Sequence, residues 1–151
     1  MICLLDVDNQ ETAKELYTMQ LESYKVEANL IDFHDLPPLK ETLEVLQASQ
    51  ETFYGYYMEN KLVGAISYKV VDNVLDIHRV IVKPTHFRRG IAQELMKKVL
   101  YLPKQLDKVI VSTAKKNTPA IHLYKRFGFR LVEEIYLTDK LTLVKMEKSF
   151  V

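Results

Sequence analysis

The segment from Val80 to Ala92 constrains this chain most, because it joins three elements in a fixed order. The β-branched run Val80-Ile81-Val82 predicts a strand, a proline ends it, and apolar residues at helical spacing predict a helix afterwards. A short basic loop with Arg88, Arg89 and Gly90 lies between them. A strand, a basic loop and a helix N-terminus in this order expose backbone N–H groups that bind phosphate. The segment therefore predicts a site for a diphosphate-bearing ligand.

The loop differs from two other phosphate-binding patterns. It lacks the arrangement G-x-x-x-x-G-K-[ST], which argues against a nucleoside-triphosphate loop. No G-x-G-x-x-G follows a first strand, which argues against a dinucleotide-binding fold.

Composition narrows the class of protein further. The chain has 151 residues, the size of one domain, and a formal net charge of +1, which gives no support to nucleic-acid binding. Its single cysteine, Cys3, excludes an internal disulfide and a multi-cysteine metal site, so we expect no metal. We find no signal-peptide pattern and no apolar stretch of about 20 residues, so we expect no membrane span. The expected location is the cytoplasm.

Hydrophobic periodicity predicts the order β α α β β β α β α β β, a mixed α/β domain. Strands are expected over 2–7, 53–58, 62–71, 74–82, 108–113, 129–137 and 141–146. A turn at Glu59-Asn60-Lys61 and a tight hairpin turn at Asp72-Asn73 are expected to join three of these strands into an antiparallel meander. Helices are expected from 8 or 9 to just before 29, over 39–46, over 90–102, and from 117 to a stop at Gly128. Regular alternation along 74–82 predicts one face with Asp76, His78, Val80 and Val82, and another with Leu75, Ile77, Arg79 and Ile81.

A second pattern reads Asn117-x-x-Ala120-x-x-Leu123-Tyr124-x-x-x-Gly128-Phe129. Asn117 is a natural helix N-cap, and Tyr124 at helical spacing is a natural core residue. A tyrosine hydroxyl also serves as a general acid. The pairing with the basic loop favours this functional interpretation.

Together the two patterns resemble the GNAT superfamily of N-acetyltransferases. The cofactor loop of that family reads Q/R-x-x-G-x-G/A, and here the sequence is Phe87-Arg88-Arg89-Gly90-Ile91-Ala92. Gly90 and Ala92 fit, whereas Phe87 stands where the family has Gln or Arg. The resemblance implies a single domain over 1–151, with about four helices and a largely antiparallel mixed sheet of six to seven strands. Two central strands of that sheet would splay apart into a V.

The same resemblance implies acetyl-CoA as cosubstrate. The strand at Val80, Ile81 and Val82 would hold the pantetheine arm, and the loop and helix start would hold the pyrophosphate mainly through backbone N–H groups. Asn117 and the neighbouring Ala120 would reach the cofactor, and Tyr124 would protonate the leaving thiolate. The expected cofactor contacts are Val80, Ile81, Val82, Phe87, Arg88, Arg89, Gly90, Ile91, Ala92, Asn117, Ala120 and Tyr124.

Acetyl transfer also needs a group that takes a proton from the ammonium form of the acceptor. His78 has a suitable intrinsic pKa, and a partly buried structural histidine is the alternative interpretation. Asp76 and Glu41 are further candidates, and water without a protein base is another. The expected catalytic residues are Tyr124, His78 and Asp76.

Glu41, Tyr54 and Tyr56 are the expected contacts of the acceptor. We expect an N-acetyltransferase that transfers acetyl directly to an amine of a small molecule or peptide. An alternative is a catalytically weak module of the same fold that binds acetyl-CoA. We expect neither nucleic acid nor membrane as partner, and a homodimer is one expectation because many members of the family are dimers.

Overall fold

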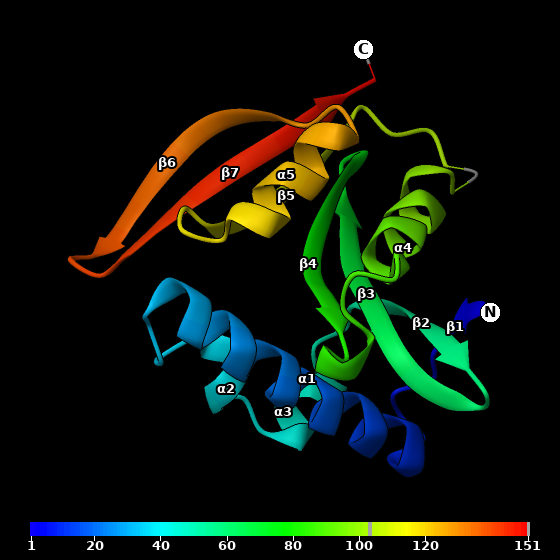
Figure 1. Cartoon of the computed structure of the whole chain (residues 1–151). Helices are drawn as coiled ribbons and strands as arrows, with labels where there is room; N and C mark the ends of the chain where they lie inside the picture. The colour runs from blue at the N-terminus through cyan, green and yellow to red at the C-terminus, as the bar shows by residue number, and fades with distance from the viewer. Residues whose placement is uncertain (103, 151) are drawn as a thin grey trace.

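The computed structural model describes residues 1–102 and 104–150, and its centre is a sheet of seven strands in the order β1-β2-β3-β4-β5-β7-β6 (Figure 1). All neighbours pair antiparallel except β4 and β5, which are parallel. The strands are β1 (Ile2–Leu4), β2 (Thr52–Met58), β3 (Lys61–Val71), β4 (Val74–Val82), β5 (Lys108–Ala114), β6 (Arg130–Thr138) and β7 (Leu141–Ser149). The element order and the mixed sheet confirm the predicted fold class.

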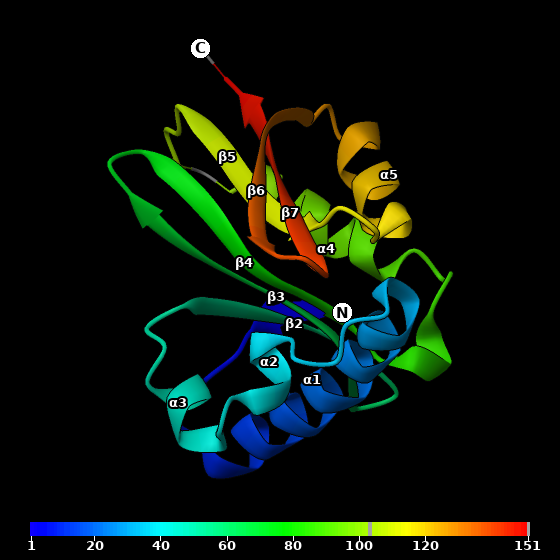
Figure 2. The ribbon, with the colours of Figure 1, turned by 90° about the vertical axis from the view of Figure 1, so that its left-hand side faces the viewer.

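Helices cover both faces of this sheet. The helices are α1 (Gln10–Ile31), α2 (Pro37–Lys40), α3 (Leu43–Gln47), α4 (Ile91–Leu100) and α5 (Thr118–Arg126), with a short 3-10 turn η1 (Pro84–His86). Figure 2 shows α1, α2 and α3 together on one side of the strands and α4 and α5 on the other. We call these sides the α1 face and the α4 face. In the described part of the chain, no helix is long and apolar enough to cross a membrane.

Two tight turns connect the strands of the meander β2–β3–β4, and three of their four central residues are Asn or Asp. Asp72 and Asn73 have φ values of 51° and 62°, and Glu59 and Asn60 have 52° and 65°. Positive φ at both central residues defines the tight hairpin turn whose twist matches that of the flanking strands. Asn and Asp tolerate this conformation better than most residues do. The predicted hairpins at both positions are therefore confirmed.

Helix α1 runs across the sheet and contacts two parts of it. Leu16 and Met19 in its first half pack with Ile81 of β4 in one apolar cluster. Ala28 and Ile31 in its second half pack in another cluster, with residues from the end of β5 and the start of β7. In Figure 1, α1 correspondingly passes under both groups of strands. Side chains midway along α1 therefore lie between the C-terminal ends of β4 and β5.

The helical predictions needed two corrections. Helix α1 continues past Asn29 to Ile31, because Ala28 and Ile31 are buried and Asp32 ends the helix with a φ of 55°. The helix expected over 39–46 is split into α2 and α3, so residues 1–102 and 104–150 form five α-helices, where about four were expected. The break lies at extended Glu41, and the Oγ1 of Thr42 accepts from the Val45 N–H as the N-cap of α3.

The regular alternation predicted along β4 was wrong. Ser67 of β3 pairs with Arg79, and the next residue, Tyr68, pairs with Ile77, so His78 is an extra residue in β4. Such a β-bulge exchanges the faces of the residues that follow it. Ile77 therefore packs on the α4 face, whereas Arg79, predicted on the same face as Ile77, lies on the α1 face. Val80, Val82, Leu75 and Ile77 share the α4 face, and Ile81 packs against α1.

Candidate active site

The parallel pair β4–β5 separates halfway along its length. Its register begins with Val74 opposite Lys108 and ends with Ile77 opposite Val111. Beyond these residues β4 stays paired with β3, and β5 stays paired with β7. Strands that remain bound to their outer neighbours but not to each other diverge. The V-shaped splay predicted between the central strands therefore begins directly after Ile77 and Val111.

The opened edge of β4 presents backbone polar groups. The N–H of Lys83 donates to the carbonyl of Val63 in β3 at 2.8 Å. Because N–H groups alternate between the two sides of a strand, those of Val80 and Val82 point to the other side, toward the opening. Val80 and Val82 thus lie where the sequence predicted a strand that binds a ligand through its main chain.

The loop after β4 leads to a helix N-terminus that no side chain caps. Gly90 is the N-cap of α4 with a φ of 77°, and it makes no side-chain cap hydrogen bond. A Cβ placed on Gly90 would meet nothing within 4 Å, so the space beside it is open. Arg88, with a φ of 63°, and Arg89 are exposed, as is Phe87. Ile91 is buried, so only its backbone is available to a ligand, and Ala92 follows in the first turn.

Helix α5 runs from Asn117, whose N–H donates to Ala114 at the end of β5, back to Tyr124, which packs with Ile77 and Val111 at the inner end of the V. The Oδ1 of Asn117 accepts from the Ala120 N–H at 3.3 Å, which makes Asn117 the N-cap of α5. Its Nδ2 donates to Oε1 of Glu27, which belongs to α1, at 2.6 Å. Tyr124 follows two turns later and is 5% exposed, with its ring 5.9 Å from that of Phe129. Asn117 and Tyr124 therefore belong to the same helix, two turns apart, as the sequence predicted.

The Tyr124 hydroxyl is held in its neutral form. Burial, and then the charge of Glu27, raise the pKa of Tyr124 well above its ordinary value. Burial, Glu27 and Tyr124 likewise raise the pKa of Tyr24, which lies on α1. A phenol with a raised pKa remains protonated at neutral pH and can donate its proton. The hydroxyl therefore carries the proton that the predicted role as general acid requires, but the same surroundings make it a weaker proton donor than a free tyrosine.

His78 lies at the bulge between two carboxylates. Its Nε2 is 3.5 Å from Oδ2 of Asp76, and its Nδ1 is 3.7 Å from Oε2 of Glu51. The side chain of His78 is 33% exposed and that of Asp76 is 48% exposed, so solvent reaches both. Burial, ahead of all other causes, raises the pKa of Asp76. The structure thus brings together the predicted pair His78 and Asp76 and adds Glu51 to it.

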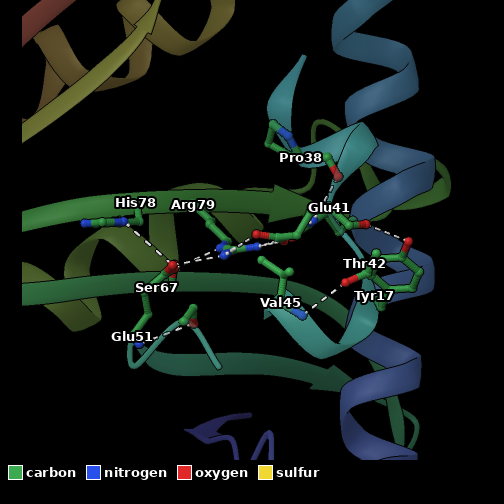
Figure 3. A network of polar contacts seen from close by, with 11 residues as sticks. Tyr17, Pro38, Glu41, Thr42, Val45, Glu51, Ser67, His78 and Arg79 are labelled. Carbon is green, nitrogen blue, oxygen red and sulfur yellow. Dashed lines mark hydrogen bonds and ion pairs between the residues drawn. The ribbon is translucent and has the colours of Figure 1, made fainter. Parts of the chain in front are cut away.

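Arg79 is the centre of a buried polar network on the α1 face (Figure 3). Its Nε and Nη2 donate to the two oxygens of Glu51 at 2.8 and 2.9 Å. It also donates to Gln20 of α1 at 2.7 Å and to both carboxylate oxygens of Glu41. Ser67 donates to Glu51 at 2.5 Å. The network joins α1, the α2–α3 linker and the sheet beside the bulge.

Two of the predicted acceptor contacts lie away from the third. Tyr54 and Tyr56 pack against the apolar cluster of the α4 face, and Tyr54 lies under Nζ of Lys98, which is 5.2 Å from its ring centre. Glu41 is on the α1 face, where Arg79 and Gln20 donate to its carboxylate. Phe53 of β2 packs in the cluster on the α1 face, and Tyr54 and Tyr56 point to the opposite face because side chains alternate along a strand. The sheet therefore separates the two tyrosines from Glu41.

Sequence reasoning missed the residues that α1 contributes to the site. Gln20, Tyr24 and Glu27 lie on the side of α1 that packs on the sheet, and Gln20 is completely buried. A glutamine in the apolar stripe of a helix was the available signal, because a buried polar side chain needs a partner. Glu51, in a stretch assigned to no element, gave no such signal.

The structure was also searched for metal-binding groups and for cavities. Among residues 1–102 and 104–150, no group of three or more His, Cys, Asp or Glu side chains could hold a metal ion. A cavity of about 110 Å³ lies between the end of α1 and the β6–β7 turn, and Ile31, Lys116 and Lys140 are among the residues that line it.

One family model and two proteins of known sequence are similar to this chain. The model of the acetyltransferase (GNAT) family matches residues 13–129, most of the chain. Streptothricin acetyltransferase of Escherichia coli is 28% identical over 132 residues, which cover 84% of this chain and 74% of that protein. UPF0157 protein YqkA of Bacillus subtilis is 36% identical over 143 residues. That match covers 95% of this chain and 42% of YqkA, so the chain spans less than half of that relative.

Solved structures share the fold at low sequence identity. The PaiA N-acetyltransferase of Thermoplasma acidophilum, solved with coenzyme A, has a TM-score of 0.82 at 18% identity, covering 99% of this chain and 98% of the other. The ribosomal-protein-S18-alanine N-acetyltransferase of Escherichia coli has a TM-score of 0.80 at 15% identity, covering 99% and 92%.

Proposed function

The chain belongs to the acetyltransferase (GNAT) family, and we propose that it transfers acetyl from acetyl-CoA to a primary amine of a small cationic molecule. The observation that carries this proposal is the splay of β4 from β5, with an uncapped helix start near one end and Tyr124 at the other. The similarity to streptothricin acetyltransferase supports a small-molecule acceptor over a peptide.

The residues present fit acetyl-CoA. The space beside Gly90 is open, and the first N–H groups of α4 have no side-chain cap, so a pyrophosphate can approach the backbone there. Arg88 and Arg89 add positive charge to the same loop. The N–H groups of Val80 and Val82 would pair with the amides of the pantetheine arm. Because these contacts are made by backbone, Phe87 does not prevent them.

Acetyl-CoA supplies the thioester whose carbonyl carbon the amine attacks. A main-chain N–H on the opened edge of β4 would hold the developing oxyanion, because it already points into the V. Tyr124, which is protonated at neutral pH, would give its proton to the departing thiolate. Positioning by the two strand edges supplies much of the remaining rate acceleration.

The charge beside the opening favours a cation. Glu41, Glu51 and Asp76 carry carboxylates on the α1 face, and Arg79 is the cation that pairs with the two glutamates. Lys145 is a second cation, since its charge acts on Asp76, so three carboxylates against two cations leave one negative charge, which attracts an ammonium group.

The test measures release of free CoA thiol from acetyl-CoA with streptothricin, spermidine and L-lysine as acceptors, together with acetyl-CoA binding by calorimetry. We expect binding and amine-dependent thiol release with at least one of these acceptors. Binding without thiol release would contradict the transferase proposal and would favour the acetyl-CoA-binding module.

A further inference from the structure

Glu27 is a carboxylate held beside Tyr124 that the catalytic scheme above does not use. It lies in the last third of α1, next to Ala28, which packs with the end of β5. Its Oε1 accepts from Nδ2 of Asn117 at 2.6 Å, and its charge raises the pKa of Tyr124. Asn117 and Tyr124 are two turns apart on α5, so Glu27 faces the same side of α5 as the Tyr124 hydroxyl.

The surroundings of Glu27 make it a stronger base than an exposed glutamate. Burial raises its pKa, and the hydrogen bond from Asn117 offsets part of that increase. The titratable groups that interact with it are Tyr24 on α1 and Tyr124 on α5, both of which remain neutral. The pKa of Tyr24 is also affected by two charges of the buried network: Arg79 lowers it and Glu51 raises it. Within the described part of the chain, Oε1 accepts the bond from Asn117 and Oε2 accepts none.

We propose that Glu27 is the general base of the acetyl transfer, and this inference rests on the transferase function proposed above. Its carboxylate takes one proton from the ammonium group of the acceptor, and the neutral amine then forms the C–N bond to the acetyl carbon. The C–S bond breaks, and the thiolate takes the proton of Tyr124. The nitrogen loses its second proton to the Tyr124 phenolate, and Glu27 returns the first proton to solvent, so both side chains are reset.

His78 is the competing candidate, and its geometry is less suited. Its two ring nitrogens face the carboxylates of Asp76 and Glu51 at 3.5 and 3.7 Å, and His78 is not among the groups that act on Tyr124. Glu27 instead neighbours the acid that completes the same reaction. One base and one acid on facing helices can act on opposite sides of a single reacting carbon.

The decisive variant is Glu27→Gln, because a glutamine Oε1 can still accept from Asn117 while the side chain no longer titrates. The matched control is Glu22→Gln, an exposed position on the same helix. With streptothricin as acceptor, kcat of Glu27→Gln should fall by roughly 10²-fold or more, and acetyl-CoA affinity should be unchanged. The kcat/KM of this variant should keep rising with pH, because only amine already deprotonated in water can react. Wild type and Glu22→Gln should instead reach a plateau.

A second measurement needs no acceptor. In protein labelled with ¹³C-glutamate, the Glu27 carboxyl should titrate above the ordinary value of about 4.3 by NMR. A wild-type pH profile in Glu27→Gln would overturn the inference, as would a carboxyl that titrates at or below that value. A loss of the plateau in His78→Gln but not in Glu27→Gln would assign the base to His78. Wild-type protein that transfers no acetyl to any amine would instead refute the proposed function.

Discussion

Replacement of Arg79 by methionine tests whether the buried network stabilises the fold through charge. Methionine keeps much of the side-chain volume but leaves two carboxylates unpaired, those of Glu51 and Glu41, which are 6% and 16% exposed. Removing one partner from a buried ion pair costs about 3–5 kcal/mol of unfolding free energy. For a domain of this size each kcal/mol corresponds to about 2–4 °C, so the melting temperature should fall by roughly 6–20 °C.

The pH dependence separates charge from packing. Burial alone would raise the pKa of Glu51, but hydrogen bonds from Arg79 and Ser67 and the charge of Arg79 outweigh it and lower that pKa. In the wild type this stabilisation is present above the unfolded pKa and is lost as pH falls through the lower folded value. Without Arg79, burial raises the pKa of Glu51. Protonation of Glu51 as pH falls therefore removes the cost of burying its unpaired charge in the variant. The difference in stability between the two proteins should therefore shrink between pH 7 and pH 4.

The assay is urea denaturation followed by circular dichroism at several pH values, with Arg130→Met as the matched control. Arg130 is 75% exposed and lies 3.7 Å from Glu147, so its loss should change the unfolding free energy by about 1 kcal/mol or less. The reasoning is refuted if both variants lose the same stability. It is also refuted if the loss in Arg79→Met is constant with pH, because only lost packing against Phe53 would then remain.

Three further predictions concern the site and its support. Tyr124→Phe should lower kcat by roughly 10²-fold with acetyl-CoA affinity unchanged, because only the proton of the acid is removed, and unchanged turnover would exclude Tyr124 as the acid. Gly90→Val should weaken acetyl-CoA binding in calorimetry and cost about 1–2 kcal/mol of stability, since its φ is 77°; equal affinity would contradict backbone binding of the pyrophosphate. Gly64→Ala should cost about 1–3 kcal/mol in urea denaturation, because the added Cβ would lie 2.6 Å from Cγ2 of Ile91 and 3.3 Å from the Ile81 carbonyl; wild-type stability would show that α4 can shift.

Most helices and strands could be predicted from the sequence because the patterns that indicate them are local. The Asp72-Asn73 turn and the Asn117 N-cap each depend on residues within a few positions, and both occur where predicted. The end of α1 was misplaced because burial of Ala28 and Ile31 against distant strands extends the helix past Asn29. Tertiary packing routinely overrides local propensity in this way.

Parts of the site could not be predicted because their contacts are distant in sequence. The Asn117–Glu27 bond spans 90 residues, and the Arg79–Glu51 bond spans 28. Nothing near Glu27 distinguishes it from the other glutamates of α1. Tyr54, by contrast, was assigned to the acceptor from its chemistry alone, and only the pairing of β2 with β3 shows which face it occupies.

The bulge at His78 connects the site to the stability of the fold. Side-chain direction in a strand has a period of two, so one extra residue moves Arg79 to the face of α1 and Val80 to the face of α4. The bend that accompanies a bulge lies where β4 leaves β5, directly after Ile77. If the same sequence were paired without the bulge, His78 would take its place in the alternation and Arg79 would point into the apolar cluster that holds Ile77, away from both of its glutamates. The bulge therefore turns Arg79 toward its glutamates at the same point along β4 where the V begins.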